Sequence, residues 1–423
     1  MFSSQAYSNG HHRQQGGSAT SSEQQLGMSH RQRVRRGSRR SRDSRDTYVS
    51  GGSIRVSEQE QQPERPPFTD FDMAYFNSYA HVGIHEEMIK DRVRTETYRA
   101  AIMRHQNFIA GKVVMDVGCG TGILSIFCAQ AGAKRVYAVD ASEIAVQANE
   151  VVRANNLSDV VIVLHGRVED VQIEEGVDVI ISEWMGYMLL YESMLGSVIT
   201  ARDRWLKPGG LILPSNATLY MAPVTHNDRY RESIDFWRNV YGIDMSAMLP
   251  LAKQCAFEEP SVETIAGENV LTWPHVVKHV DCYSVTIQEL QSVTTRYRFK
   301  SMMRAPLHGF AFWFDVEFNG PAISQTNRQP SALMADNQAE DGSQRKKRTN
   351  PNEALVLSTA PEDPQTHWQQ TLIYFYDPID LEQDQVIEGS ATLSQSRENA
   401  RFMNIRLEYA SGQRSFVKEC VMR

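Results

Sequence analysis

The segment Val113-Val-Met-Asp116-Val-Gly118-Cys-Gly120-Thr-Gly122 has the composition of a buried strand that runs into a glycine-rich turn. The apolar run from Ile123 to Ala131, with Gly132 behind it, is typical of a helix that ends at a glycine C-cap. Because glycine carries no side chain, a turn with three glycines lets the backbone approach a ligand closely. Open α/β sheets bind ligands at this carboxyl end of a strand. The segment therefore predicts the ligand-binding unit of a parallel sheet.

The spacing of the glycines distinguishes between ligands. A dinucleotide fingerprint needs its third glycine at position 123, which is Ile123, so a pyrophosphate loop is disfavoured. The next strand, Val136 to Asp140, ends in an acid that can accept hydrogen bonds from both hydroxyls of a ribose. Nearby acids at Glu143, Glu169 and Asp170 favour a cationic ligand. S-Adenosylmethionine has a ribose, a cationic sulfonium and no phosphate, and we predict it as the cofactor.

Two glutamates follow a further β-branched strand, Val177 to Ser182. Glu183 stands where that strand stops, at the same edge of the sheet as Gly118 and Asp140. Glu192 comes after a loop rich in aromatic residues, so the chain can double back and bring both carboxylates together. The Asp/Asn-Pro-Pro-aromatic turn of nucleic-acid amino methyltransferases is absent from this position. A pair of carboxylates instead suits arginine, whose planar guanidinium stays charged and offers paired donors.

The chemistry of arginine explains the need for two acids. A guanidinium nitrogen is a poor nucleophile because its lone pair is delocalised. Carboxylates that draw positive charge toward two of the nitrogens leave the third more electron-rich and aligned with the methyl group. Catalysis would then come from positioning and electrostatics. We predict methyl transfer to arginine.

Together with further motifs, these residues resemble the protein arginine N-methyltransferases of type I, which form asymmetric dimethylarginine, and among them the plant form of member six. The resemblance covers roughly residues 70 to 423. The further motifs are Tyr75-Phe-Asn-Ser-Tyr79, Gly83-Ile-His85-Glu-Glu-Met88, Asp91-Arg-Val-Arg94-Thr95, Ser182-Glu-Trp-Met-Gly-Tyr-Met-Leu-Leu-Tyr-Glu192-Ser-Met194 and Thr366-His367-Trp368. The resemblance implies an α/β fold, in which a Rossmann-like S-adenosylmethionine-dependent methyltransferase domain is followed by an antiparallel β-barrel domain with a helical dimerisation arm.

The resemblance also implies the catalytic residues. Glu183 and Glu192 would hold the target guanidinium between them. His367, with Asp91 as its partner, would stabilise a lid over the site and help the proton to leave. Tyr79 would close over the site from an N-terminal helix.

The cofactor pocket follows from the same resemblance. Arg94 would pair with the methionine carboxylate, Asp140 with the ribose and Glu169 with the adenine side. Asp140 departs from the family pattern, because many members have a glutamate at this position. The full set of residues implied to line the pocket is Tyr79, His85, Met88, Arg94, Gly118, Asp140, Glu169 and Met194, of which the two methionines would limit the product to monomethyl and asymmetric dimethyl forms.

The chain changes character after Pro214. Short alternating runs replace alternating strands and helices and predict antiparallel β-structure; they include Tyr297–Lys300, Phe310–Phe318 and Thr371–Tyr376. The stretch from Tyr230 to Leu249 is predicted to be helical, either as a dimerisation arm or as a core helix that folds back. The predicted organisation is a disordered tail at 1–66, N-terminal helices and the methyltransferase domain at 67–213, and a β-barrel substrate domain at 214–423, with the arm near 226–250 and a flexible insertion near 322–352.

Charge is unevenly distributed along the chain. Residues 1–66 contain 11 arginines, no lysine and 6 acids, a net charge of +5, and their Ser, Gly, Gln and Arg content predicts disorder. The whole chain carries −7, so residues 67–423 carry −12. An acidic body suits arginine-rich protein partners, such as histone tails and Gly/Arg-rich proteins, and argues against phosphate-driven nucleic-acid binding. The basic segment Arg31–Arg45 is open to three interpretations: contact with nucleic acid, contact with the acidic body, or solvation.

Further sequence patterns limit the cellular location and the cofactors that we expect. No apolar run reaches the roughly eighteen residues of a membrane helix, and the N-terminus lacks a signal-peptide pattern, so we expect a nuclear or cytoplasmic protein with no membrane partner. The five cysteines lack metal-ligand spacing, so we expect reduced thiols and no metal. Arg345–Arg348 is either a nuclear-import signal or a solvated charge run.

Two alternative functions stay open from the sequence. One is a methyltransferase for a small guanidino or amine metabolite. The other is a scaffold that binds arginine-rich tails without catalysis. A β-barrel domain and an acidic body favour a peptide substrate, and the intact pair of acids favours catalysis.

Overall fold

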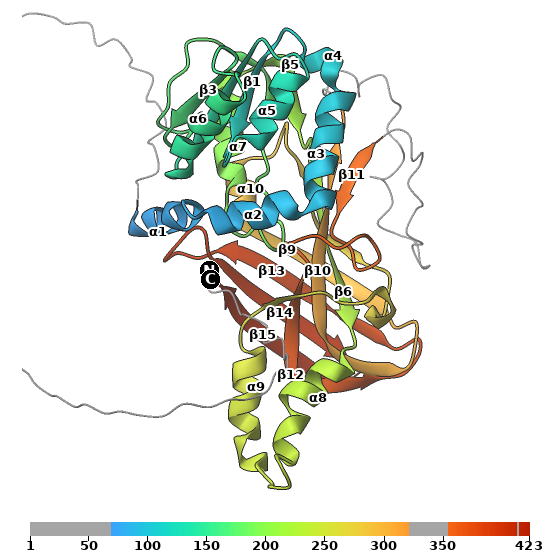
Figure 1. Cartoon of the computed structure of the whole chain (residues 1–423). Coiled ribbons are helices and arrows are strands. Elements are labelled where there is room, and N and C mark those ends of the chain that lie inside the picture. The colour runs from blue at the N-terminus through green and yellow to red at the C-terminus, as the bar shows by residue number, and fades with distance from the viewer. Residues whose placement is uncertain (1–68, 321–353, 413) are drawn as a thin grey trace, which may run out of the picture. The chain divides into compact units, whose positions relative to one another are not determined.

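The computed structural model describes residues 69–320 and 354–423, apart from Gln413. The predicted tail at 1–66 and the predicted insertion at 322–352 lie outside the described residues. Residues 67–423 belong to one compact unit. The described part of that unit contains a parallel sheet, two antiparallel sheets and the helices around them (Figure 1).

Helices come first in the described chain. Asp91 is the N-cap of the helix α3 (Arg92–Arg104), because its side chain accepts a hydrogen bond from the backbone N–H of Arg94. The helix α1 (Asp70–Tyr79) begins with a capping box, in which the side chains of Thr69 and Asp72 each accept a hydrogen bond from the backbone N–H of the other residue. In Figure 1, the first two helices run across the junction between the parallel sheet and the antiparallel strands. The helices before the first strand are α1 (Asp70–Tyr79), α2 (Val82–Lys90), α3 (Arg92–Arg104) and α4 (Gln106–Ile109).

The parallel sheet has the strand order β3-β2-β1-β4-β5. The chain moves outward on one side of β1 and then returns to place β4 on its other side, so the order reverses at β1. Ligands bind in α/β sheets at such a reversal, outside the carboxyl ends of the strands. The strands are β1 (Val113–Val117), β2 (Arg135–Asp140), β3 (Val161–His165), β4 (Val177–Ile181) and β5 (Leu206–Leu213), and the helices between them are α5 (Ile123–Gln130), α6 (Ile144–Ala154) and α7 (Leu195–Trp205).

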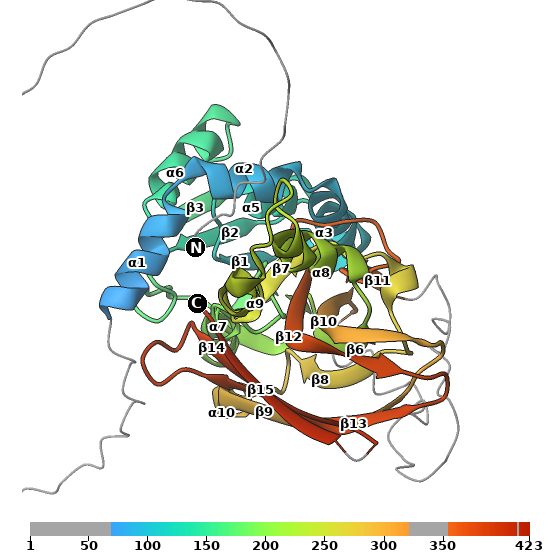
Figure 2. The same ribbon diagram turned by 90° about the horizontal axis from the view of Figure 1, so that it is seen from below.

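The remaining strands pair antiparallel in two sheets, of which one has the order β7-β12-β10-β6-β8, with β11 beside β10, and the other β15-β14-β13-β9. The predicted runs at 297–300, 310–318 and 371–376 lie in β9, β10 and β12. Seen from below in Figure 2, β13 to β15 curve around one side of this part of the molecule. The strands are β6 (Asn216–Val224), β7 (Ser261–Glu263), β8 (His275–Asp281), β9 (Ser292–Lys300), β10 (Ala305–Phe318), β11 (Leu355–Ser358), β12 (Gln370–Leu381), β13 (Val386–Gln395), β14 (Met403–Ser411) and β15 (Arg414–Met422).

A helical hairpin extends away from the antiparallel strands (Figure 1). It consists of α8 (Asn227–Ser233), η1 (Asp235–Arg238), η2 (Ser246–Met248) and α9 (Leu249–Phe257). The prediction of one helix from Tyr230 to Leu249 is wrong in its middle. Tyr241 and Gly242 have positive φ angles of 53° and 84°, and a bridge between Val240 and Ile243 closes a turn there. The other described helices are the 3₁₀ helix η3 (Gly267–Asn269) and the α-helix α10 (Ile287–Gln291).

One hydrophobic cluster runs through the parallel sheet and both antiparallel sheets. It contains Val114 and Ile180 from the first and Phe310 and Tyr409 from the others. A second cluster, which includes Tyr230, lies at the base of the hairpin. A continuous core fixes the edge of the parallel sheet against the antiparallel strands. Among the described residues, no helix is long and apolar enough to cross a membrane.

We expect Phe310→Ala to lower the free energy of unfolding by about 3–5 kcal/mol, because it removes a fully buried ring from this core. The ring of Phe310 on β10 lies 5.4 Å from that of Tyr297 on β9, in the other antiparallel sheet, and 5.6 Å from that of Phe375 on β12, so its loss removes a packing contact between the two sheets. Chemical denaturation measures the change. Val417→Ala, at a position that is 55% exposed on β15, is the control and should leave the unfolding midpoint near that of the wild type. Equal midpoints for both variants would contradict the assignment of this core.

Candidate active site

The turn after β1 forms a cradle. Gly118, Gly120 and Gly122 have φ angles of 74°, 54° and 83°, which residues with a side chain rarely adopt. The backbone N–H groups of Gly118 and Cys119 donate to the carbonyl of Val139 at 2.8 and 3.0 Å and hold the turn against β2. A Cβ atom on Gly118 would overlap the end of the Met194 side chain. The backbone therefore favours glycine at position 118, and a side chain there would also displace the end of Met194.

Asp140, the last residue of β2, faces the same turn. Its Oδ2 accepts a hydrogen bond from the backbone N–H of Gly120 at 2.8 Å. Its Oδ1 accepts from the backbone N–H and the hydroxyl of Ser142 at 2.8 and 2.7 Å. The carboxylate is thus fixed beside the glycine turn, where Oδ2 keeps a lone pair for a further donor such as a ribose hydroxyl.

Helix α2 covers the turn from the other side. His85 is buried, and its Nε2 lies 2.8 Å from the carbonyl oxygen of Tyr79. A Cβ on Gly120 would lie 3.1 Å from the His85 ring, so the imidazole sits directly against the cradle. The hydroxyl of Ser142 also reaches the Tyr79 carbonyl, at 3.5 Å. The end of α1 is therefore tied to both α2 and the loop after β2.

Asp116, two residues before Gly118, carries an oxygen with no partner. Its side chain is fully buried; Oδ2 accepts a hydrogen bond from Ser125 at 2.6 Å, while Oδ1 has none. Burial raises the pKa of Asp116 to about 7. A buried acceptor without a donor suits a ligand that brings a positive group or a donor to the cradle, as S-adenosylmethionine does. No group of three or more metal-ligating side chains occurs within the described residues.

Glu169 lies in the loop after β3, and its Oε1 accepts a hydrogen bond from the hydroxyl of Ser197 on α7 at 2.8 Å. The guanidinium of Arg204, also on α7, donates to the backbone carbonyls of Val168 and Glu169 at 2.9 and 3.0 Å. This loop is thereby fixed near the edge of the sheet on the β3 side of the glycine turn.

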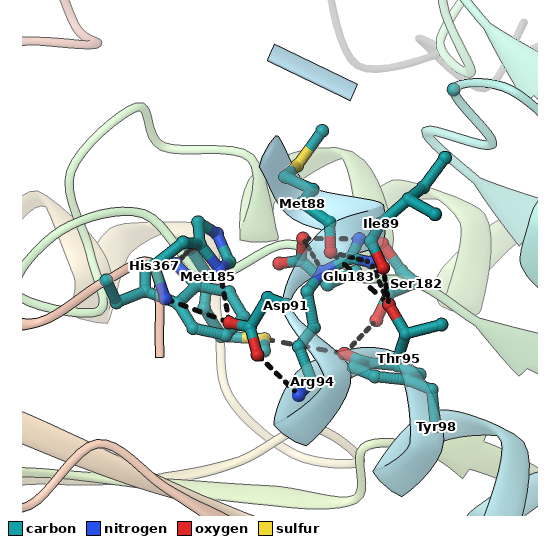
Figure 3. Close-up of polar contacts among 12 residues, drawn as sticks. Met88, Ile89, Asp91, Arg94, Thr95, Tyr98, Ser182, Glu183, Met185 and His367 are labelled. Carbon is teal, nitrogen blue, oxygen red and sulfur yellow. Dashed lines mark hydrogen bonds and ion pairs between the residues drawn. The ribbon is translucent and has the colours of Figure 1, made fainter. Parts of the chain in front are cut away.

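Glu183 follows β4 and is paired with Arg94 from α3 (Figure 3). Both Nε and Nη2 of Arg94 donate to Oε2 of Glu183, at 3.1 and 2.9 Å. The two side chains are only 6% and 8% exposed, so the ion pair is out of solvent. Nη1 of Arg94 donates to the carbonyl of Met88 at 3.4 Å. The resemblance pairs Arg94 with the cofactor; the structure places the same guanidinium against the first glutamate.

Asp91 connects α3 with the antiparallel strands (Figure 3). Its Oδ2 accepts a hydrogen bond from the backbone N–H of His367 at 2.9 Å and lies 2.7 Å from Nδ1 of the His367 ring. Burial alone would raise the pKa of Asp91, but the hydrogen bonds from His367 and from the Arg94 backbone outweigh it and lower the pKa. Trp368 donates from Nε1 to the carbonyl of Met185 at 2.8 Å. The His367 segment therefore holds both the start of α3 and the loop after Glu183.

Glu192 is held from α1. The hydroxyls of Tyr75 and Tyr79 both donate to its Oε2, at 3.1 and 2.8 Å. Glu192 is 8% exposed, and burial raises its pKa although the two tyrosine hydrogen bonds act against the shift. Both tyrosine donors bind one carboxylate oxygen, so Oε1 keeps its capacity to accept from a guanidinium.

The loop that carries Glu192 has an unusual backbone. Met188, Leu189, Glu192 and Ser193 all have positive φ angles, of 49°, 64°, 73° and 57°. Each costs a non-glycine residue roughly 1–2 kcal/mol, so the surroundings must hold the conformation.

Comparison with known proteins matches both parts of the chain. Residues 215–331 and 346–414 match the family described as arginine methyltransferase oligomerization subdomain, and residues 99–215 match ribosomal protein L11 methyltransferase (PrmA). Over 362 residues, the chain is 78% identical to probable protein arginine N-methyltransferase 6 of Arabidopsis thaliana, covering 85% of this chain and 83% of that protein. This chain belongs to the protein arginine N-methyltransferases.

More distant relatives agree. The arginine methyltransferase described here is 44% identical over 347 residues to protein arginine N-methyltransferase 6 of Danio rerio, covering 81% of this chain and 90% of that protein. It superimposes with a TM-score of 0.69 on Trypanosoma brucei PRMT1 in a complex with AdoHcy, at 33% identity over 82% of this chain and all of that one. The superposition on Arabidopsis thaliana protein arginine methyltransferase 10 has a TM-score of 0.67, also at 33% identity over 82% of this chain and all of that one. S-Adenosylmethionine is the cofactor of this arginine methyltransferase.

The arginine methyltransferase thus brings several predicted residues into contact, since Asp140 and His85 lie against the glycine turn, Arg94 binds Glu183, and Tyr79 binds Glu192. The side chain of Glu169 instead binds Ser197, which is outside the predicted set. Gly118 and Glu183 come just after β1 and β4, and Asp140 is the last residue of β2, as the strand pattern predicts. Sequence reasoning assigned no role to Tyr75 or Asp116. An acid inside an otherwise apolar five-residue strand was a signal for Asp116.

We expect Gly186→Ala to reduce arginine methylation at least tenfold, because a Cβ there would overlap the backbone carbonyl of Tyr191 and push the Glu192 loop out of position. Turnover of an arginine peptide measures the loss. Gly196→Ala is the matched control, since a Cβ at Gly196 meets nothing within 4 Å. Wild-type turnover by Gly186→Ala would show that the loop tolerates displacement.

Proposed function

We propose that this enzyme methylates arginine side chains of histone tails and Gly/Arg-rich proteins, and that it stops at monomethyl and asymmetric dimethylarginine. The observation that carries the proposal is the pair of buried carboxylates, Glu183 and Glu192, beside the glycine cradle.

The two glutamates can both accept hydrogen bonds from a substrate guanidinium. Glu183 has one oxygen occupied by Arg94, and Glu192 has one oxygen occupied by Tyr75 and Tyr79. Each glutamate can therefore offer its other oxygen to the substrate. Hydrogen bonds to two charged acceptors fix the plane of a guanidinium and draw its positive charge toward the bound nitrogens.

S-Adenosylmethionine supplies an electrophilic methyl group on a sulfonium. The residues of the chain bring the free guanidinium nitrogen into line with it and exclude water. That nitrogen would gain the methyl carbon as the carbon–sulfur bond of the sulfonium breaks to leave a neutral thioether, and it would lose a proton. Glu192, whose pKa burial raises, and the Asp91–His367 pair are the groups near the site that can receive or pass on the proton.

Two methionines support the proposed product. The end of the Met194 side chain fills the space beside Gly118, and Met88 lies on α2 next to Arg94. A bulky Met194 side chain beside the cradle, with a second methionine on α2, would leave a methylated nitrogen little freedom to turn, which favours a second methyl group on the same nitrogen.

The charge of the body supports a peptide substrate. Residues 67–423 carry −12, which attracts cationic, arginine-rich segments. Such proteins occur in nucleus and cytoplasm, which are the compartments we propose for the enzyme. A small guanidino metabolite is the alternative substrate, and competition between free arginine and a peptide arginine separates the two.

Mass spectrometry of a histone-tail peptide and a Gly/Arg-rich peptide, incubated with S-adenosylmethionine, tests the proposal. We expect asymmetric dimethylarginine with the wild type and a loss of at least a hundredfold in turnover with Glu183→Gln or Glu192→Gln, because each substitution removes a charged acceptor. Symmetric dimethylarginine would contradict the product assignment. Cofactor binding without any methylation would favour the scaffold alternative.

We also propose that the hairpin α8–α9 joins two copies of the chain. Its turn and outer face expose Phe236, Tyr241, Ile243 and Leu251 at 50%, 99%, 62% and 60%. Apolar side chains that gather on one projecting element are typical of a protein interface. The match to an arginine methyltransferase oligomerization subdomain over this region supports the assignment.

The triple change Phe236→Ser, Tyr241→Ser and Ile243→Ser should convert a dimer to a monomer in sedimentation velocity at micromolar concentration, since each change removes apolar area from the contact. Trp273→Ser, at an exposed position outside the hairpin, is the control and should leave the dimer intact. A monomeric wild type would mean that the hairpin has another role.

A further inference from the structure

Arg401 stands in the short loop between β13 and β14, far along the chain from both glutamates, yet its guanidinium reaches two parts of the active site. Nε and Nη2 donate to Oδ1 of Asp72 on α1, at 3.0 and 2.8 Å. Nη1 donates to the backbone carbonyl of Glu192 at 3.0 Å. The side chains of Arg401 and Asp72 are 19% and 20% exposed, so the ion pair is mostly shielded from water.

The Arg401 guanidinium also packs on the ring of Tyr75, whose hydroxyl binds Glu192. The carbon of the Arg401 guanidinium lies 3.8 Å from the centroid of the Tyr75 ring. A cation over an aromatic face at this distance is attracted by the ring. Tyr75 in turn donates its hydroxyl to Oε2 of Glu192. Arg401 therefore contacts the backbone of Glu192 and also the side chain that orients its carboxylate.

The loop around Arg401 holds the strained backbone of the Glu192 segment. The backbone N–H of Glu192 donates to the carbonyl of Arg401 at 3.1 Å. The hydroxyl of Ser193 donates to the carbonyl of Ala400 at 2.6 Å and accepts from the Gln395 amide at 3.0 Å. Glu192 and Ser193 are both in left-handed conformations, which persist only when neighbours fix them.

From these contacts we propose that Arg401 is a positioning residue for methyl transfer, which couples the docking of α1 to the placement of the Glu192 carboxylate. The proposal rests on the proposed role of Glu192 in holding the substrate guanidinium. When α1 is docked, Asp72 and Tyr75 fix the Arg401 guanidinium, and Arg401 fixes the Glu192 backbone. When α1 leaves, Glu192 loses both tyrosine donors and the ordered Arg401 at once.

The electrostatic surroundings of Glu192 give the proposal a readout that a purely structural role would lack. Burial raises the pKa of Glu192, the tyrosine hydrogen bonds and the charge of Arg401 lower it, and the charge of Glu183 raises it. Removal of Arg401 therefore raises the pKa further, so that protonation begins to inactivate the enzyme at a higher pH. The groups that face Glu192 are Tyr75 and Tyr79 from α1, Glu183 after β4, Arg401 from the β13–β14 loop, and Tyr187 and Tyr191 from its own loop.

The test compares Arg401→Ala, Arg401→Lys and Glu192→Gln with the wild type in steady-state methylation of an arginine-rich peptide over a range of pH. We expect Arg401→Ala to lower kcat about 10- to 100-fold, the loss typical of hydrogen bonds to charged groups, and to move the acid limb of the kcat profile to higher pH. Arg401→Lys keeps the charge but not the planar fork, so it should restore the acid limb and only part of kcat. The equilibrium affinity for S-adenosylmethionine should change less than threefold, because the contacts of Arg401 are with α1 and the Glu192 loop rather than the glycine cradle.

Matched variants separate coupling from simple loss of stability. Arg406→Ala removes an arginine from the neighbouring strand β14, where it pairs with Glu408 and Glu419, and should behave as the wild type. Asp72→Asn should lower kcat, and its effect should be less than additive with that of Arg401→Ala if the two act as one unit.

The measurements distinguish a positioning role of Arg401 from a purely structural one, and both from the role of Glu192 itself. A wild-type kcat and acid limb in Arg401→Ala, with an inactive Glu192→Gln, overturns the coupling and leaves the role of Glu192 intact. A fully active Glu192→Gln overturns the role of Glu192 itself. A fall in kcat that follows a fall in melting temperature, with an unmoved acid limb and no rescue by Arg401→Lys, makes Arg401 a structural residue only and also overturns the proposal.

Discussion

Exclusion of water from Glu183 and Glu192 is the constraint that the surrounding structure satisfies. A carboxylate that leaves water loses several kcal/mol of hydration unless donors or opposite charges replace it. Arg94 from α3 replaces it for Glu183, and Tyr75 and Tyr79 from α1 replace it for Glu192. The helices before the parallel sheet are therefore part of the candidate active site, since they supply the partners of both acids.

The antiparallel half completes the same task from the other side. His367 binds Asp91 at the start of the helix that carries Arg94, and Arg401 binds the helix that carries the two tyrosines. Residues from loops beside the antiparallel strands thus hold the start of α3 and the helix α1, which carry the donors to the two glutamates. The common hydrophobic core makes this possible, because it holds the parallel sheet and the antiparallel strands next to the His367 and Arg401 loops in one fixed relation.

Local sequence was sufficient to predict the features that depend on neighbours in the chain. The strand, glycine turn and helix from Val113 to Gln130 are encoded by a single segment, and strand ends place Asp140 and Glu183 at one edge of the sheet. The resemblance to a family supplied His85, Arg94 and Tyr79, which composition alone would not single out. Their contacts with the glycine turn, Glu183 and Glu192 bring them into the site.

Features that depend on distant contacts escaped prediction. The ion pair of Asp72 with Arg401 joins residues 329 positions apart, and no local pattern marks either partner. The left-handed backbone of Glu192 lacks the glycine that would signal it, because neighbouring strands rather than the residue type impose it. In the hairpin, apolar content suggested one helix, but Gly242 and the bridge beside it close a turn instead.

Glu192 and Arg401, whose side chain supports it, are far apart in the sequence, so they are synthesised at different times. The parallel sheet and its glycine turn can form from residues that leave the ribosome early. The backbone of Glu192 is bound by Arg401, which is made 209 residues later. A nascent chain could therefore acquire a cofactor cradle long before it has a positioned pair of glutamates. A chain that ends before Arg401 lacks this support for the backbone of Glu192.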